Sequence, residues 1–77
     1  MAGSIRTPQR ITMDPSIRFG KPTVFGTRIS VADILGWLAA GMSIAEIVQD
    51  YPDLDSDAVY AALEYAASAT DSRRIAV

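Results

Sequence analysis

Apolar residues follow two different patterns on either side of Ser30. Before it, short stretches rich in isoleucine, valine and threonine stand between prolines and glycines, which is typical of short strands joined by turns. After it, apolar residues recur three and four positions apart in three successive runs, which is the spacing of one helix face. The pattern predicts a β-rich segment over residues 10–29 and three helices over residues 30–69.

Capping signals bound the first two predicted helices. Ser30 and Ser43 are good N-cap residues, and each has an acidic residue three positions later, at the spacing of a capping box. We expect Gly41 to end the first helix in a left-handed conformation and Pro52 to end the second. The stripes expected to face the core are Val31, Ile34, Leu35 and Leu38 in the first helix and Ile44, Ile47, Val48 and Tyr51 in the second.

The third predicted helix completes a helix-turn-helix pattern. Asp55 or Ser56 is expected to cap it, and it runs to about Ala69. Three capped helices of about ten, eight and fourteen residues, joined by short turns, match a helix-turn-helix, with a plain three-helix bundle as the alternative. The residues expected to face the core are Val59, Ala62, Leu63 and Ala66.

The segment before the helices is expected to form short strands. Residues 11–13 can form one strand, and residues 22–24 and 27–29 can form a tight hairpin. The hairpin would turn at Phe25 and Gly26, because Gly26 tolerates a positive φ. The fold class is thus mainly α, with short β-strands or a hairpin preceding the helix-turn-helix.

Length and composition limit the chain to one small domain. Its 77 residues are 49% hydrophobic, and no apolar run approaches the roughly 20 residues that span a bilayer. We expect residues 1–9 and 70–77 to be tails around a single domain over residues 10–69. The start of the chain has no signal-peptide pattern, so a cytoplasmic location is the default and no membrane partner is expected.

Catalysis and metal binding have little support in the residues present. The chain has no cysteine and no histidine, so it lacks a thiolate ligand, the commonest nitrogen ligand and the commonest general base. Gly20-Lys21 lacks the remaining residues of a phosphate-binding loop. We therefore expect a binding module, with no enzymatic activity, no metal site and no cofactor.

Charge is distributed unevenly along the chain. Residues 1–28 contain five basic residues and one acidic residue, whereas residues 29–72 contain eight acidic residues and no basic one. Arg73 and Arg74 follow, and the net charge is −2. Because DNA binding depends on cations near phosphates, the third helix is a poor DNA reader, and any such contact should come from the segment before the helices.

Several short motifs together resemble a known family. The residues that carry the resemblance are Asp14-Pro15, Gly20-Lys21-Pro22, Gly26-Thr27-Arg28-Ile29, Val31, Gly41-Met42-Ser43, Glu46-Ile47, Tyr51-Pro52, Leu54, Ala61-Ala62-Leu63 and Tyr65-Ala66. Through them, over residues 10–69, the chain is similar to the small prokaryotic family catalogued as domain of unknown function 433. The resemblance implies a homeodomain-like fold, neutralisation of a PIN-like ribonuclease toxin in the manner of VapB-type antitoxins, and autorepression at operator DNA.

Arg18, Lys21 and Arg28 are the candidate nucleic-acid-binding residues. For Arg18 and Lys21 we favour solvent or phosphate as the environment. For Arg28 an internal bond to Asp14, or to a helix carboxylate such as Asp33, is the alternative, and we favour it over phosphate.

The candidate residues for binding a protein partner lie on the helices and in the C-terminal tail. Trp37 either closes the edge of the core against the hairpin or anchors an interface, and Tyr60 and Tyr65 flank the core face of the third helix. Arg73 and Arg74 could reach the acidic residues of a PIN-like nuclease, with a frayed tail as the alternative.

Three functions remain in competition. The first is an antitoxin that binds a toxin and, as a dimer or in complex, operator DNA. The second is a DNA-binding transcriptional regulator without a toxin, and the third is a helix-turn-helix protein-interaction adaptor. A chain this small leaves apolar surface to bury, so we expect a symmetric homodimer, with strand exchange or pairing through residues 10–29 as the contact.

Overall fold

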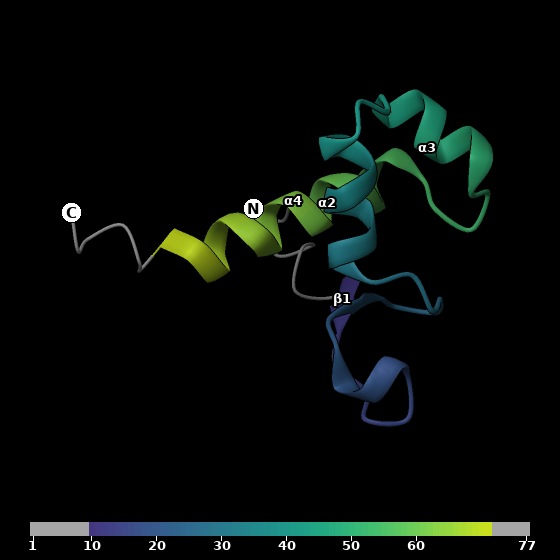
Figure 1. Ribbon diagram of the computed structural model, residues 1–77. Coiled ribbons are helices and arrows are strands. Elements are labelled where there is room, and N and C mark those ends of the chain that lie inside the picture. The colour runs from purple at the N-terminus through teal and green to yellow at the C-terminus, as the bar shows by residue number, and fades with distance from the viewer. Residues whose placement is uncertain (1–9, 72–77) are drawn as a thin grey trace, which may run out of the picture.

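The computed structural model describes residues 10–71. Three helices and a short two-stranded antiparallel sheet form the fold, which confirms the expected class (Figure 1). None of the helices in this part of the chain is long and apolar enough to cross a membrane. The elements in chain order are β1 (Ile11–Thr12), the 3-10 turn η2 (Arg18–Gly20), β2 (Thr23–Val24), α2 (Val31–Ala39), α3 (Ile44–Asp50) and α4 (Ser56–Asp71).

The helices begin where the capping signals predict. Ser30 and Ser43 each accept a hydrogen bond from the N–H three residues later, and the carboxylate at that position accepts from the capping serine's own N–H. Both capping boxes are therefore complete. Gly41 follows α2 with a φ of 104°, the left-handed conformation that glycine adopts without steric cost.

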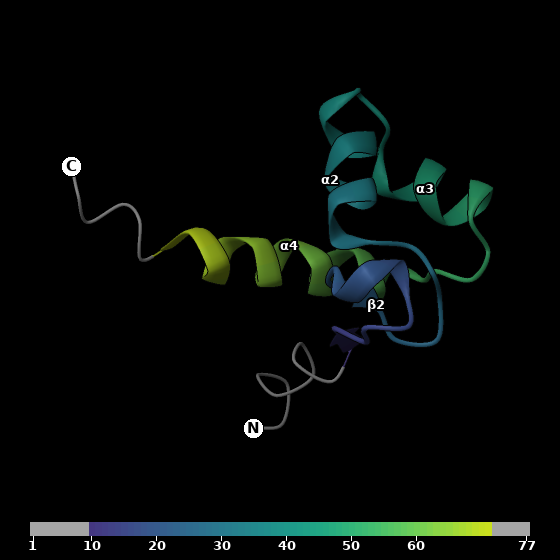
Figure 2. The ribbon, with the colours of Figure 1, turned by 60° about the horizontal axis from the view of Figure 1, so that its bottom comes forward.

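Asp55 caps α4, which settles the choice between Asp55 and Ser56. Its Oδ1 accepts the N–H of Ala58 at 2.8 Å. The helix runs to Asp71, past the expected end at Ala69, and its C-terminal half extends beyond α2 and α3 (Figures 1 and 2). The residues from Ala67 to Thr70 in this half are therefore exposed.

The core lies where α2 and α3 pack against the N-terminal half of α4. Ile34, Ile47 and Val59 are fully buried there. Ala58 and Ala61 are also buried, although the predicted stripe omitted them, because their small side chains let neighbouring elements approach α4 closely. The other residues of the predicted stripes pack against this core but are only partly buried: Leu35, Leu38, Ile44, Val48, Tyr51, Leu63 and Ala66.

The β segment pairs differently from the expected hairpin. β1 pairs antiparallel with β2, with Ile11 opposite Val24 and Thr12 opposite Thr23. The turn at Phe25 and Gly26 does form, and the N–H of Thr27 donates to the carbonyl of Val24 at 3.0 Å.

The expected second arm of the hairpin, over residues 27–29, is not a strand. Its ladder contact with β2 is limited to the bond from the Val24 N–H to the Ile29 carbonyl, at 2.9 Å, and an isolated bridge between Thr23 and Ser30 follows it. The physical reason is that Ser30 already caps α2, so the chain must turn into the helix before a ladder can extend.

Candidate interaction surfaces

The loop between β1 and β2 is held by local hydrogen bonds. Oδ1 of Asp14 accepts the N–H of Ser16 at 2.9 Å and its hydroxyl at 2.7 Å, and the Asp14 carbonyl accepts the N–H of Ile17 at 2.8 Å. The bonds from the backbone and side chain of Ser16 lower the pKa of Asp14 from its ordinary value of 3.8. Asp14 therefore shapes a turn and makes no bond to Arg28.

Arg18 connects this loop to the start of α2. Its Nη1 donates to Oδ2 of Asp33 at 3.0 Å and to the backbone carbonyl of Arg28 at 2.8 Å. The predicted internal bond to Asp33 therefore exists, but Arg18 makes it and not Arg28. That prediction for Arg28 is wrong, because the left-handed turn at residues 18–20 brings the Arg18 guanidinium back over the helix N-terminus.

Asp33 accepts hydrogen bonds both from the loop and from the start of α2. The same Oδ2 that meets Arg18 accepts the N–H of Ser30 in the capping box at 3.1 Å. Partial burial raises the pKa of Asp33, but the hydrogen bonds from Ser30 and from Arg18 outweigh it and leave the pKa below its ordinary value of 3.8. A carboxylate that caps a helix thus also fixes the loop.

Lys21 and Arg28 are the basic side chains that remain available for a partner within residues 10–71. Arg10 pairs with Asp55 at 2.8 Å and Arg18 with Asp33, whereas Lys21 and Arg28 are exposed. The pairing with Arg10 is the first cause of the lowered pKa of Asp55, followed by the N–H of Ala58. Two of the three candidate phosphate contacts are therefore accessible, and the third is engaged.

The opposite charge gathers on α3, α4 and the turn between them. Glu46, Asp50, Asp53 and Asp57 are exposed there, and α4 has no basic residue in its last turn. Phosphate would be repelled from such a surface. Within the described residues no group of three or more acidic side chains has the arrangement of a metal site.

The loop presents an aromatic side chain to solvent in a strained conformation. Arg18 and Phe19 have φ values of 53° and 60°, in the left-handed region that residues with a Cβ rarely adopt. Phe19 is 98% exposed. The neighbouring contacts of Asp14 and Arg18 hold the conformation, so this exposure belongs to an ordered loop.

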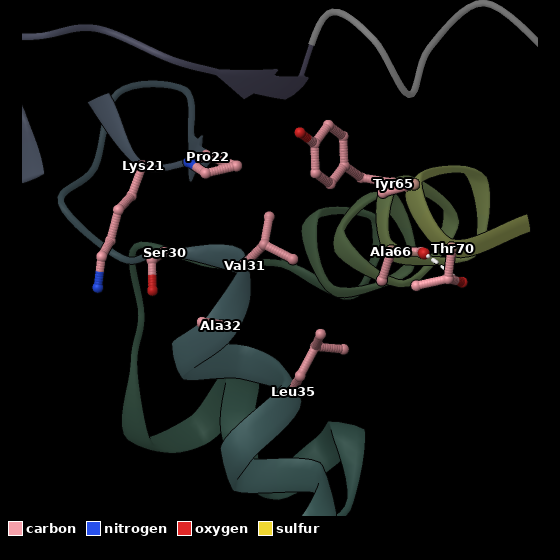
Figure 3. A pocket seen from close by; sticks show the side chains of 10 residues that line it. Lys21, Pro22, Ser30, Val31, Ala32, Leu35, Tyr65, Ala66 and Thr70 are labelled. Carbon is pink, nitrogen blue, oxygen red and sulfur yellow. Dashed lines mark hydrogen bonds between the residues drawn. The ribbon is translucent and has the colours of Figure 1, made fainter. Parts of the chain in front are cut away.

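An apolar groove lies between α2 and the C-terminal half of α4. Val31 and Leu35 of α2 face Tyr65 and Ala66 of α4 across it, with Pro22 at one side (Figure 3). Its volume is about 380 Å³. The remaining lining residues are Lys21, Ser30, Ala32, Ala69 and Thr70.

The predicted partner-binding aromatics have three different environments. Trp37 is partly buried against the core and stacks on Tyr51, with ring centroids 4.1 Å apart, so it joins α2 to the end of α3. Tyr65 lines the groove, and its hydroxyl lies 3.9 Å from the Met13 sulfur. Tyr60 is 52% exposed. Arg73 and Arg74 lie outside the described residues.

Sequence reasoning missed Phe19 and the groove. The groove joins residues 21–35 to residues 65–70, and no local pattern relates segments so far apart. Phe19 does leave a signal, since it is an aromatic residue in a turn and outside every periodic stripe. Its exposure could have been suspected, but not the left-handed conformation of its backbone.

Comparisons with known proteins identify relatives of this chain. The model of the family described as "Protein of unknown function (DUF433)" matches residues 11–66. Over 56 residues the chain is 38% identical to the protein named "Uncharacterized protein y4eO" of Sinorhizobium fredii, covering 73% of this chain and 25% of the relative. Over 66 residues it is 37% identical to the protein named "Putative antitoxin VapB45" of Mycobacterium tuberculosis, covering 77% of this chain and 28% of the relative.

A solved structure shares the fold. The crystal structure of a DUF433 member protein from Anabaena variabilis matches with a TM-score of 0.77 and 25% identity, covering 90% of this chain and 70% of that one. In contrast, the chain spans only about a quarter of the length of the two curated relatives. The match therefore relates this chain to one part of those longer proteins and not to their function as a whole.

Proposed function

Because the chain belongs to the DUF433 family, we propose that it is an antitoxin-like protein that binds and neutralises a PIN-like ribonuclease toxin in the cytoplasm. One observation carries the proposal: the chain is 37% identical to the protein named "Putative antitoxin VapB45". The separation of charge adds physical support, since a small domain with one basic and one acidic surface suits binding to other macromolecules.

Autoregulation at operator DNA is the second part of the proposal. Lys21 and Arg28 are exposed, and a homodimer would double these contacts. α4 does not act as the reading helix in this proposal, because its exposed side carries Asp57 and Glu64 and no cation. We therefore assign phosphate contact to the loop segment, with Arg18 fixing the loop's shape.

The test is co-expression with a PIN-like ribonuclease of the same organism, sought first among the neighbouring genes. We expect the chain to restore growth to cells that express the nuclease, and the purified chain to suppress RNA cleavage in proportion to the complex formed. Replacing Arg73 and Arg74 together by alanine is the variant, and it should weaken inhibition about tenfold or more, as for the loss of charge-assisted bonds. Full nuclease activity at saturating chain would refute the antitoxin proposal.

A transcriptional regulator without a toxin is the second candidate, and the exposed Lys21 and Arg28 favour it. A gel shift on the promoter tests DNA binding, and binding to the nuclease separates the two candidates. Promoter binding that is lost on changing Lys21 and Arg28 to glutamine, together with no binding to the nuclease, supports the regulator. Phosphate contact also requires that affinity fall steeply between about 50 and 200 mM salt, and unchanged affinity would exclude it.

A further inference from the structure

Two phenylalanines of the segment over residues 10–29 are exposed, and the proposed function uses neither. Phe19 is 98% exposed and Phe25 is 70% exposed, so both lose the stabilisation that burial of an aromatic ring gives. The left-handed backbone of Phe19 adds a further cost. Rings kept at the surface against such costs are candidates for contact with a partner, and the charged groups beside them indicate its chemistry.

An exposed cation follows each ring. Lys21 comes two positions after Phe19, Arg28 comes three positions after Phe25, and both cations are exposed. A single-stranded nucleic acid offers the matching groups, because its unstacked bases have open faces and its backbone places phosphates between them. We propose that Phe19 and Phe25 stack on bases of single-stranded nucleic acid while Lys21 and Arg28 bind its phosphates. The inference goes beyond the proposed operator contact, although it uses the same two cations.

Hydrogen bonds hold the two aromatic–cation pairs side by side. Arg18, which precedes Phe19, donates from Nη1 to the carbonyl of Arg28 at 2.8 Å. Phe25 lies in the turn just before Arg28, and the N–H of Thr27 closes that turn with a bond of 3.0 Å. The loop that carries Phe19 is thus tied to the turn that carries Phe25, and one strand can contact both rings.

Charge favours an anionic ligand here and disfavours it on the helices. Residues 30–71 carry eight acidic residues and no basic one, so phosphate is repelled from α3 and most of α4. The loop between β1 and β2 lies at the opposite end of the molecule from α3 (Figure 1). Three carboxylates at or beside the loop are already engaged: Asp14 with Ser16, Asp33 with Arg18 and Asp55 with Arg10. Lys21 and Arg28 therefore set the charge that a ligand meets.

Fluorescence anisotropy with labelled oligonucleotides of about twelve nucleotides tests the proposal. The probes are oligothymidylate, oligouridylate and a DNA duplex of the same length, so DNA, RNA and paired strands are compared. We expect the 77-residue chain to bind both single strands more tightly than the duplex, because paired bases have no open face. With two phosphate contacts, the logarithm of the association constant should fall against that of the salt concentration with a slope of about −1.4, and Lys21→Gln should halve the slope.

Substitutions of Phe19 test the stacking itself. Phe19→Ala and Phe19→Leu should each weaken binding to the single strands about 5- to 150-fold, the effect of losing one stacked base, and Phe19→Trp should bind at least as tightly as wild type. Tyr60→Ala is the matched control, because Tyr60 is an aromatic residue that is 52% exposed on the acidic α4, and it should leave binding unchanged. Circular dichroism melts confirm that each variant is folded.

The leucine variant also separates nucleic acid from other partners, because a lipid surface or an apolar protein pocket accepts leucine in place of a ring. Single strands bound by Phe19→Leu as tightly as by wild type, or a duplex bound as tightly as single strands, would overturn the proposal. Binding of wild type to vesicles of anionic phospholipid, with no binding to any oligonucleotide, would replace it with a lipid partner. Nuclease inhibition and the promoter gel shift test the proposed function separately, so its failure is distinguishable from failure of this inference.

Discussion

The segment over residues 10–29 and the helical body over residues 30–71 are stabilised in different ways. In the body, burial of apolar side chains such as Ile34, Ile47 and Val59 dominates. The segment contributes Ile11 and Val24 to the core. Its loop is otherwise held by the hydrogen bonds of Asp14 with Ser16 and of Arg18 with Asp33. Apolar burial tolerates many sequences of suitable size, whereas each polar contact depends on one donor and one acceptor.

This difference also separates stability from binding. The side chains of Phe19, Lys21 and Arg28 in the segment contact solvent, so changing them should alter partners without unfolding the domain. Changing buried residues of the body should do the reverse. The following substitutions test that separation, from the largest expected effect to the smallest.

The largest effect should come from the core of the body. Ile47→Ala removes a side chain that is 0% exposed, so we expect a loss of about 2–5 kcal/mol in the free energy of unfolding. The free energy of unfolding of a domain of this size is only a few kcal/mol, so the variant should be partly unfolded at room temperature. Urea denaturation followed by circular dichroism measures it. Phe25→Ala, within about 0.5 kcal/mol of wild type, is the control.

The junction between the two regions comes next. Asp33→Ala removes both the bond that completes the capping box and the pair with Arg18, and we expect a loss of about 1–2 kcal/mol. Glu46→Ala removes the equivalent box residue of α3, which makes no ion pair among the described contacts, and should cost about half as much. Equal losses in urea denaturation would show that Arg18 does not stabilise the junction.

Acid should weaken the same junction. The pKa of Asp33 and that of Asp55 are both lowered in the folded chain, so each contributes stability that is present above the ordinary value of 3.8 and is lost as pH falls below it. We expect the melting temperature to fall between pH 5 and pH 3. The fall should be smaller than the one that Asp33→Ala causes, because both carboxylates contact water. If the melting temperature of Asp33→Ala depended on pH in the same way as that of wild type, Asp33 would not contribute to the loss of stability in acid.

The smallest effect concerns strain at Phe19. Glycine adopts the observed φ of 60° without steric cost, and the exposed ring has no packing to lose. Glycine relieves the strain of the left-handed backbone but loses more conformational entropy on folding than alanine does. On balance we expect Phe19→Gly to stabilise the monomer by roughly 0.5 kcal/mol relative to Phe19→Ala. Both are compared at concentrations where neither dimerises. A less stable glycine variant would mean that the left-handed turn stores no strain.

Local sequence signals determined the helices. Ser30, Ser43 and Asp55 cap them where predicted, because a capping bond spans only three residues and needs no tertiary partner. The separation of basic and acidic segments was likewise readable from the sequence, and it places Lys21 and Arg28 in the segment over residues 10–29.

Only the tertiary structure decided which arginine pairs with Asp33, that Ala58 and Ala61 belong to the buried face of α4, and where the apolar groove lies. Arg18 and Arg28 carry the same charge, and the left-handed turn at residues 18–20 brings Arg18 to the carboxylate. Ala58 and Ala61 are buried although they lie outside the predicted stripe, and α4 is in contact with α2, α3 and β1. The groove exists because α4 extends beyond α2, and such a feature depends on how helices cross, which local spacing does not encode.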